Sequence, residues 1–560
     1  MVKMKERNAQ LKSALVGMTT KEIVKEVNNI PVEDTVNRQG YAAYSLSDEL
    51  RLISMLNTLK LEPQYYRSEN DTMRELRELV ERIGLRDPYF LCQAIVYSRC
   101  MGEGMRSINH LAATLAAPFI AGQPYAKAFY GLFDKRNRQG GVVYRTDDMS
   151  EMKDVWMALN SGRSLPNAMK KGFATAIEGL DTYQLSKYKK TVIDIANLVH
   201  PKSGKSLATI QIDGNTVKVI DALMNGITVT ADTWESAQTE AGQEVAKAVR
   251  EGKLSKEKAE EVLKEAKAEN WNSLLKDRSL GILAALRNIR AIMNNSNANS
   301  DTMKMLCNLL SDGNAIRKGL IMPYQIDTAY EVVREEVATS YEQRDLLKAL
   351  IKGYEAAVPN LGAALPGKTC VMIDCSGSMH TRCKIKRNGK WESMRNATAC
   401  EKAGLVAATI AKVTNADVVR FGSRAEITSY DPNKNVFELG AELSRDNMGG
   451  TSIAAAFNAI KGRKYDRIIL LSDYEANTGR TSTSYKDYLR SVNVSPYVYC
   501  IDFAAYGTAP LKNDGKINYY YGFGYSMFDD IASKEFNPQM HIDKVRAVVI
   551  DPNYTPVKAA

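Results

Sequence analysis

The stretch TCVMIDCSGSM, residues 369–379, decides the fold of the last third of this chain. It begins as an uninterrupted apolar run and ends in an aspartate followed by two serines. Further apolar runs are ADVVRF at 416–421, RIILLSD at 467–473 and SPYVYCIDF at 495–503, and helical patterns at 396–413, 452–460 and 484–492 separate them. Fully apolar strands that alternate with helices are typical of a parallel sheet covered on both faces. We therefore predict a doubly wound, Rossmann-like α/β domain over residues 366–560.

Five oxygen-bearing side chains stand at the ends of these runs: Asp374, Ser376, Ser378, Thr451 and Asp473. In a doubly wound sheet, ligands bind beyond the carboxyl ends of the strands. Carboxylates, hydroxyls and water around an open position suit a hard divalent cation such as Mg²⁺. Each piece has a simpler explanation, because an aspartate after a buried strand often caps a helix. The ordered set of three strand or helix ends favours a metal site for Mg²⁺ or another divalent cation.

The same residues carry a resemblance to a known family. DCSGSM at 374–379, GGTS at 449–452 and LLSDYE at 470–475 resemble the metal-ion-dependent adhesion site of von Willebrand factor A domains. The resemblance implies a cation with one coordination position left for an acidic group of a partner. The basic loop 380–395, which follows the motif, is longer and more basic than is usual in that family. The open position could therefore take water or a nucleic-acid phosphate instead of a protein carboxylate.

A second motif, GAALPGKT at 362–369, satisfies the pattern of a phosphate-binding loop. Such a loop follows a strand and opens a helix, where its backbone amides cradle phosphates. Here the motif precedes the predicted strand at 369–374 and follows GYEAAVPN. We interpret it as a linker that matches by chance, and we do not expect Lys368 to support nucleotide hydrolysis.

Residues 1–365 read as successive helices. In SLPNAMKKGFATAIEGL, residues 164–180, apolar side chains recur at the four-and-three spacing of a buried helical stripe. Similar patterns occur at 46–60, 71–84, 255–275 and 280–293. Many paired helices favour an α-solenoid, although no fixed sequence period is present. Asp213-Gly214 between two alternating runs predicts a small β insertion at 205–230.

Four stretches of this region resemble the TROVE domain of Ro autoantigen proteins: GRSLPNAMKKGFATAIEGLDTYQLSKYKK at 162–190, LVHPKS at 198–203, DTWESAQTEAGQ at 232–243 and WNSLLKDRSLGILAALRNIR at 271–290. With the carboxyl-terminal motifs, the resemblance covers nearly the whole chain. It implies a ring of HEAT-like helical repeats joined to a von Willebrand factor A domain. It also implies small noncoding RNA of the Y RNA type on the outer surface, single-stranded 3′ ends of misfolded RNA in the ring, and cooperation with an exoribonuclease such as polynucleotide phosphorylase.

Basic residues suited to RNA phosphates gather within 121–190, where twelve Lys and Arg face seven Asp and Glu. The candidates for RNA binding are Lys135, Arg136, Arg138, Arg163, Lys170, Lys171, Lys187, Lys189, Lys190 and His200. Tyr188 could stack on a base. A solvated helix face explains each lysine about as well, and His200 before Pro201 is typical of a helix end.

The bulk composition limits the class of protein. At 560 residues, more than one folding unit is expected. No apolar run is long enough for a membrane span, the amino terminus lacks the apolar core of a signal peptide, and the eight cysteines form no CxxC pair. We expect a cytoplasmic protein with reduced thiols, no membrane association and a monomeric state.

Three functions remain open at this stage. The first is a noncatalytic RNA-binding scaffold, since the chain has four histidines and no pattern of a catalytic triad. The second is an α-solenoid adaptor that binds protein partners, one of them through the cation, without RNA. The third is a metal-dependent nuclease, in which the cation would activate water. Salt separates the first two, because phosphate binding weakens steeply with ionic strength.

Overall fold

The structure of this chain is a computed structural model. It describes residues 19–59, 66, 68–101, 105–135, 137–227, 229, 245, 247–249, 251, 255–295, 300–318, 321, 323–336, 341–357, 367–381, 384–387, 390–393, 398–512, 516–521 and 540–553. The described residues form two compact units, one from residues 1–227 together with 361–560 and one from residues 228–360. This grouping differs from the predicted division at 365/366, a position that lies outside the described residues, so the domain boundary stays a prediction.

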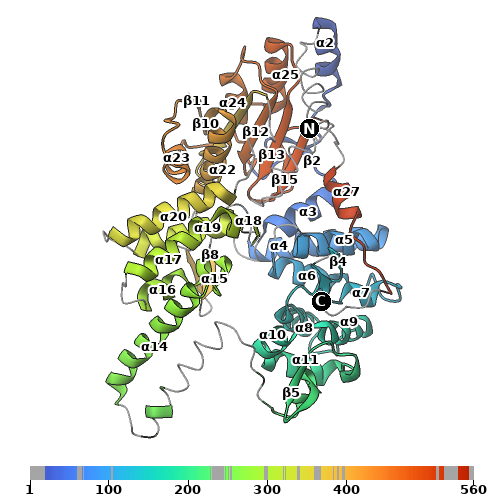
Figure 1. Ribbon diagram of the computed structural model, residues 1–560. Coiled ribbons are helices and arrows are strands. Elements are labelled where there is room, and N and C mark those ends of the chain that lie inside the picture. The colour runs from blue at the N-terminus through green and yellow to red at the C-terminus, as the bar shows by residue number, and fades with distance from the viewer. Residues whose placement is uncertain are drawn as a thin grey trace, which may run out of the picture. The chain divides into compact units, whose positions relative to one another are not determined.

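A six-stranded mixed sheet forms the centre of the carboxyl-terminal part (Figure 1). Its strands are, in spatial order, β11 (Ala425–Thr428), β10 (Asp417–Phe421), β7 (Thr369–Asp374), β12 (Arg467–Ser472), β13 (Tyr497–Asp502) and β15 (Ile517–Tyr521). The strands from β10 to β15 are parallel, and β11 pairs antiparallel with β10 at the edge. The predicted α/β domain is confirmed at this level.

The chain order of these strands places the switch point beside β7. From β7 the chain crosses through α22 (Ala399–Thr414) to β10, and later it passes from β12 through α25 (Thr481–Val492) to β13 on the other side. Right-handed crossovers in opposite directions put α22 and α25 on opposite faces of the sheet. Helices α23 (Val436–Leu443) and α24 (Ile453–Ala459) pack against α22 and α25, respectively. Ligands of such sheets bind where the strand order reverses.

Local sequence explains why these elements form where they do. All residues of β7 and β12 are buried, as the uninterrupted apolar runs predict. Helix α22 begins with a capping box, in which Thr398 and Glu401 satisfy each other's backbone N–H groups. It ends at Asn415 in the left-handed conformation, with φ of 52°.

Helices dominate the first 227 residues. They are α2 (Thr20–Asn29), α3 (Asp48–Thr58), α4 (Glu69–Arg86), α5 (Pro88–Val96), α6 (Ser107–Ala116), α7 (Ala126–Phe129), α8 (Thr146–Leu159), α9 (Asn167–Gly179), α10 (Thr182–Lys187), α11 (Lys189–Val199) and α12 (Val219–Met224). The apolar stripe predicted in 164–180 is confirmed, because Met169, Phe173 and Ile177 of α9 are fully buried. The grouping of these helices into HEAT-like repeats and a ring stays a prediction.

The predicted β insertion is a hairpin of β5 (Thr209–Ile212) and β6 (Asn215–Lys218). Its two turn residues, Asp213 and Gly214, have φ of 47° and 78°. Positive φ at both central positions is the requirement of a type I′ turn, which an Asp-Gly pair meets without strain.

Long-range hydrogen bonds join the helical segment to the α/β part within the first unit. Strand β2 (Ala42–Ser45) pairs with β1 (Thr35–Val36) and with β14 (Thr508–Ala509) in a three-stranded sheet. The Gln93 side-chain amide in α5 donates to the carbonyl oxygens of Arg546 and Val548 at 2.6 and 2.9 Å. These contacts explain why residues 1–227 and 361–560 form one unit.

The second unit is helical. Its described helices are α14 (Lys256–Lys276), α15 (Ile282–Arg287), α16 (Ile289–Asn295), α17 (Ser300–Ser311), α18 (Gly313–Lys318), α19 (Pro323–Glu336) and α20 (Tyr341–Ala357). The single helix expected at 280–293 is wrong in one respect, because the chain breaks between α15 and α16 at Asn288. Within the described parts of the chain, no helix is both long and apolar enough to cross a membrane.

Candidate functional site

The two candidate metal carboxylates follow neighbouring parallel strands. β7 ends at Asp374, and β12 ends one residue before Asp473, with Ile373 opposite Leu471 in the register. Asp374 is fully buried and Asp473 is 3% exposed. Because the strands run parallel, their carboxyl ends meet at one edge of the sheet, as the sequence predicts.

Hydroxyl groups link the two carboxylates. The Oγ atoms of Ser376 and Ser378 lie 3.2 Å apart. Ser376 hydrogen-bonds to Asp374, and Ser378 hydrogen-bonds to Asp473. Four of the five predicted ligand side chains therefore form one hydrogen-bonded group.

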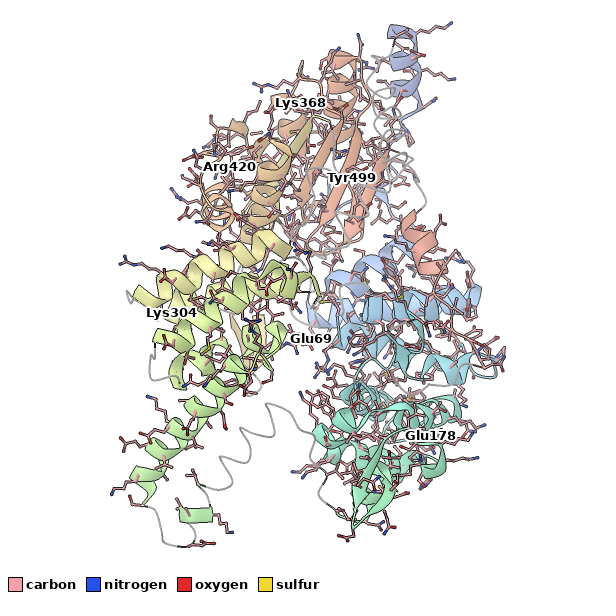
Figure 2. The ribbon with its side chains drawn as sticks, viewed as in Figure 1. Glu69, Glu178, Lys304, Lys368, Arg420 and Tyr499 are labelled. Atoms are coloured by element: carbon pink, nitrogen blue, oxygen red, sulfur yellow. The ribbon has the colours of Figure 1, made fainter. Side chains whose placement is uncertain are left out.

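The backbone of the fifth residue, Thr451, is tied to the same loops. Its N–H donates to the Asn477 side-chain oxygen at 2.9 Å, and its carbonyl accepts from Asn477 N–H at 2.9 Å. The neighbouring Gly449 carbonyl accepts from Gly377 N–H, inside the DCSGS loop, at 2.9 Å. Arg420, labelled in Figure 2, extends from β10 and donates to Asp446 at 2.9 Å, which helps to hold the loop that leads to Thr451.

The electrostatics of the site fit a cation. Burial raises the pKa of Asp374 to about 7, and repulsion from the Asp473 carboxylate adds to the rise. Burial also raises the pKa of Asp473. Among the described residues, no three His, Cys, Asp or Glu side chains are grouped to hold a metal. The donor set here is two carboxylates with hydroxyls, which is a set that Mg²⁺ accepts together with water.

Sequence reasoning missed a third carboxylate, Glu475. Its side chain is fully buried two residues beyond Asp473. Burial and the Asp473 carboxylate raise the pKa of Glu475 to about 8, and Arg38 only partly offsets this. Asn37, the neighbour of Arg38, donates its side-chain amide to the Ala476 carbonyl at 2.6 Å. The LLSDYE motif contained the residue, but only the fold shows that the amino-terminal hairpin lies over it.

Two other residues near the motifs take structural positions. His380 Nε2 lies 3.3 Å from the carbonyl oxygen of Asp446. Lys368 lies before the amino-terminal end of β7, the end opposite to the metal residues, and it is labelled in Figure 2. Its backbone N–H donates to Asp466 at 2.6 Å, and its Nζ lies 4.9 Å from the Tyr465 ring centroid. A strand follows this lysine where a phosphate-binding loop needs a helix, which supports the linker interpretation.

A second group of side chains combines cations with tyrosine rings. We call it the Tyr188 cluster, and it consists of Lys135, Tyr144, Arg145, Lys187 and Tyr188. Lys135 Nζ lies 4.2 Å from the Tyr144 ring centroid, and Lys187 Nζ lies 5.8 Å from that of Tyr188. The Arg145 guanidinium donates to the Tyr188 hydroxyl at 2.6 Å. Tyr144 and Arg145 were missed by sequence reasoning, whereas Lys135, Lys187 and Tyr188 were named.

A buried ionic network holds the Tyr188 cluster from below. The fully buried Asp148 accepts the backbone N–H groups of Tyr144 and Arg145, both at 2.9 Å. It also accepts from the Arg99 guanidinium at 2.7 Å and lies 3.0 Å from His110 Nε2. The backbone that carries Tyr144 and Arg145 is therefore fixed by a carboxylate in the interior.

The remaining candidate RNA ligands are placed separately. Lys171, Lys189, Lys190, Arg138 and Arg163 are exposed, Lys170 is half-buried, and Arg136 lies outside the described residues. The printed contacts bring none of the described ones into the Tyr188 cluster. His200 is exposed and ends α11 with φ of 50°, which agrees with its interpretation as a helix end.

Comparisons with known proteins place the fold. No protein-family model matches the chain. No curated protein matches it. Among solved structures, the crystal structure of the Ro (RSR) protein of Deinococcus radiodurans is similar, with a TM-score of 0.53 and 15% sequence identity. The match covers 87% of this chain and 99% of that protein. The Ro resemblance inferred from the sequence is thus confirmed at the level of the fold.

Proposed function

We propose that this chain is a noncatalytic RNA-binding scaffold in the cytoplasm. It binds small noncoding RNA of the Y RNA type and the single-stranded 3′ ends of misfolded RNA, and it presents such RNA to an exoribonuclease such as polynucleotide phosphorylase. The observation that carries the proposal is the Tyr188 cluster on a Ro-like fold. It joins cations to ring faces, which is the combination that single-stranded RNA requires.

Each part of the cluster has a chemical role in this proposal. Lys135 and Lys187 are exposed and neutralise phosphates. The half-buried Tyr188 offers a ring for stacking, and the hydrogen bond from Arg145 orients that ring. The Asp148 network keeps the cluster preformed, so that little ordering is needed when RNA binds.

The proposal also assigns a divalent cation, with Mg²⁺ the expected ion, to Asp374, Ser376, Ser378, Thr451 and Asp473. Support comes from two buried carboxylates whose raised pKa values reflect a lack of positive charge nearby. When bound, the cation would neutralise these carboxylates and offer a coordination position to an acidic group or a phosphate. Ser376 and Ser378 would orient their oxygens toward it through the hydrogen bonds already described.

Binding of a labelled hairpin RNA with a single-stranded tail tests the RNA function. Tyr188→Ala should weaken binding by about 1–3 kcal/mol, because a stacked base is lost. Tyr188→Phe keeps the ring and should bind nearly as well as the unchanged protein. Lys187→Ala should reduce the dependence of log affinity on log salt by about one, since one phosphate contact is removed.

Lys304→Ala is the matched control, because this exposed lysine of α17 lies in the other unit (Figure 2). It should change neither the affinity nor the salt dependence. Equal affinity of Tyr188→Ala and the unchanged protein would refute the RNA role of the cluster. Salt-independent binding of a protein partner in its place would favour the adaptor.

The cation is tested by thermal unfolding with and without MgCl₂. Ligand that binds only the folded state raises the unfolding temperature, so the unchanged protein should respond and Asp374→Ala should not. The same samples are incubated with labelled RNA. Cleavage that requires MgCl₂ and disappears in Asp374→Ala would establish a nuclease and contradict the noncatalytic proposal.

A further inference from the structure

The second unit contains a groove that the proposed function does not use. It lies between the helix pair α15 and α16, which meet at Asn288, and helix α19. Its volume is about 670 Å³. Sites of roughly 300–1,000 Å³ suit one small organic ligand, so this groove is large enough for a single nucleotide.

The lining has two chemical halves. Leu283 and Val332 contribute to an apolar wall with several alanine and isoleucine or leucine neighbours, whereas Asn294 and Gln325 bring side-chain amides. Flat apolar surface is what a nucleobase contacts with its ring face. Amide groups can donate to and accept from the edge of a base. An inorganic anion would use only the polar half of this lining.

Charge in the groove differs from charge in the unit around it. Residues 228–360 hold 18 Lys and Arg against 20 Asp and Glu, so the unit is slightly acidic. The lining residues that the structure describes nevertheless include two arginines, Arg287 and Arg290, and no carboxylate. Both arginines are exposed. An acidic unit that gathers only cations at its groove is suited to an anionic ligand.

Helix stability explains only one of these arginines. Arg287 lies in the last turn of α15, where a cation offsets the negative end of the helix dipole. Arg290 is the second residue of α16, where the positive end of the dipole disfavours a cation. A role in binding an anion gives Arg290 a reason to be there that the helix itself does not.

We propose that this groove binds one nucleotide, with its base against the apolar wall and its phosphate held by Arg287 and Arg290. The planar guanidinium groups can bind phosphate oxygens in pairs. The nucleotide is either free or the terminal residue of an RNA. The site shares no residue with the Tyr188 cluster, so the two can fail independently.

Competition against a fluorescent AMP derivative on the full chain tests the site. Arg287→Ala/Arg290→Ala should weaken binding by about tenfold or more. Thr328→Trp should do the same by filling the groove, because Thr328 is an exposed lining residue of α19. Arg317→Ala, an exposed arginine of α18 in the same unit, should leave binding unchanged.

The competitors separate the two sources of nucleotide. If AMP competes as well as a linear oligoribonucleotide, the ligand is a free nucleotide. If the linear RNA competes far better and a circular RNA of the same sequence does not, the ligand is an RNA end. Both results require that the two groove variants lose binding.

Three results would overturn the proposal. They are undetectable binding of the probe to the unchanged protein, full binding by both groove variants, and competition by inorganic phosphate equal to that by AMP. Tyr188→Ala is included because it should leave nucleotide binding intact. Loss of hairpin RNA binding in that variant alone, or of nucleotide binding in the groove variants alone, shows which of the two proposals has failed.

Discussion

The substitution Asp148→Asn tests the ionic network beneath the Tyr188 cluster. Asp148 is fully buried, and Arg99, whose guanidinium it accepts at 2.7 and 3.0 Å, is 4% exposed. Asparagine keeps the size of the side chain and one carbonyl oxygen. It removes the charge that balances Arg99, so a guanidinium is left buried without its counter-charge.

The expected loss follows from this burial. Removing one partner of a buried ion pair costs about 3–5 kcal/mol, because the remaining charge stays desolvated. The retained carbonyl oxygen can still accept one of the hydrogen bonds from Arg99, Tyr144 or Arg145, so we expect the lower end, about 3 kcal/mol. Since 1.4 kcal/mol corresponds to a factor of ten, opening of this region should become roughly 100-fold more frequent.

Amide hydrogen exchange read by peptide is the appropriate assay. The chain forms two compact units, so one global free energy of unfolding is not well defined. Peptides from α6 and α8 should lose protection by roughly 100-fold in Asp148→Asn. Asp487→Asn is the matched control, because Asp487 accepts from Arg490 at 3.1 Å at the surface of α25. Exposed pairs contribute only about 0.2–1 kcal/mol.

Equal loss of protection in the two variants would refute the reasoning, since burial would then not decide the cost. A second consequence concerns function. Tyr144 and Arg145 donate their backbone N–H groups to Asp148. Asp148→Asn should therefore also weaken binding of the hairpin RNA, although Asp148 itself is too deeply buried to touch it.

Three further outcomes are expected. Although burial opposes it, hydrogen bonds to Asp148 and Glu151 raise the pKa of His110, so its stabilisation of α6 is complete below about pH 6.5 and is lost as pH rises through the raised pKa; exchange measured from pH 5 to 9 checks this. Without metal, protein stability should fall as pH rises from about 4 to 7, because the pKa of Asp374 is raised to about 7, and thermal scans with MgCl₂ should reverse the fall. Gly172→Ala should lower the unfolding temperature, because the added Cβ would lie 2.5 Å from Tyr130 Cβ; Gly204→Ala, with no heavy atom within 4 Å of its Cβ, should be nearly neutral.

The metal residues were predictable because their placement follows from local patterns. A buried apolar run such as TCVMID has few alternatives to a central strand, and parallel strands bring their carboxyl ends to one edge. Asp374 and Asp473 could therefore be assigned to one place although they lie 99 positions apart in the chain. Glu475 escaped because nothing in LLSDYE tells whether the residue after the tyrosine points inward.

The Tyr188 cluster shows the opposite case. Basic residues were counted correctly between 121 and 190, yet only Lys135 and Lys187 of the ten candidates join a tyrosine ring in the described contacts. Lysine side chains on a helix face have the same local sequence whether or not another helix approaches. Arg145 and Tyr188 meet across 43 positions, so their contact depends on how α8 and α11 pack.

The sequence by itself determined the α/β sheet, the loop that carries Asp374, Ser376 and Ser378, and the Asp213-Gly214 hairpin, because each follows from backbone preferences and hydrophobic periodicity over a few residues. Tertiary structure alone decided that residues 1–227 join 361–560, that 280–293 breaks at Asn288, and that Asp148 holds Tyr144 and Arg145. These features arise from pairings between distant segments, and a hydrogen bond or ion pair of that kind leaves no periodic trace in the chain.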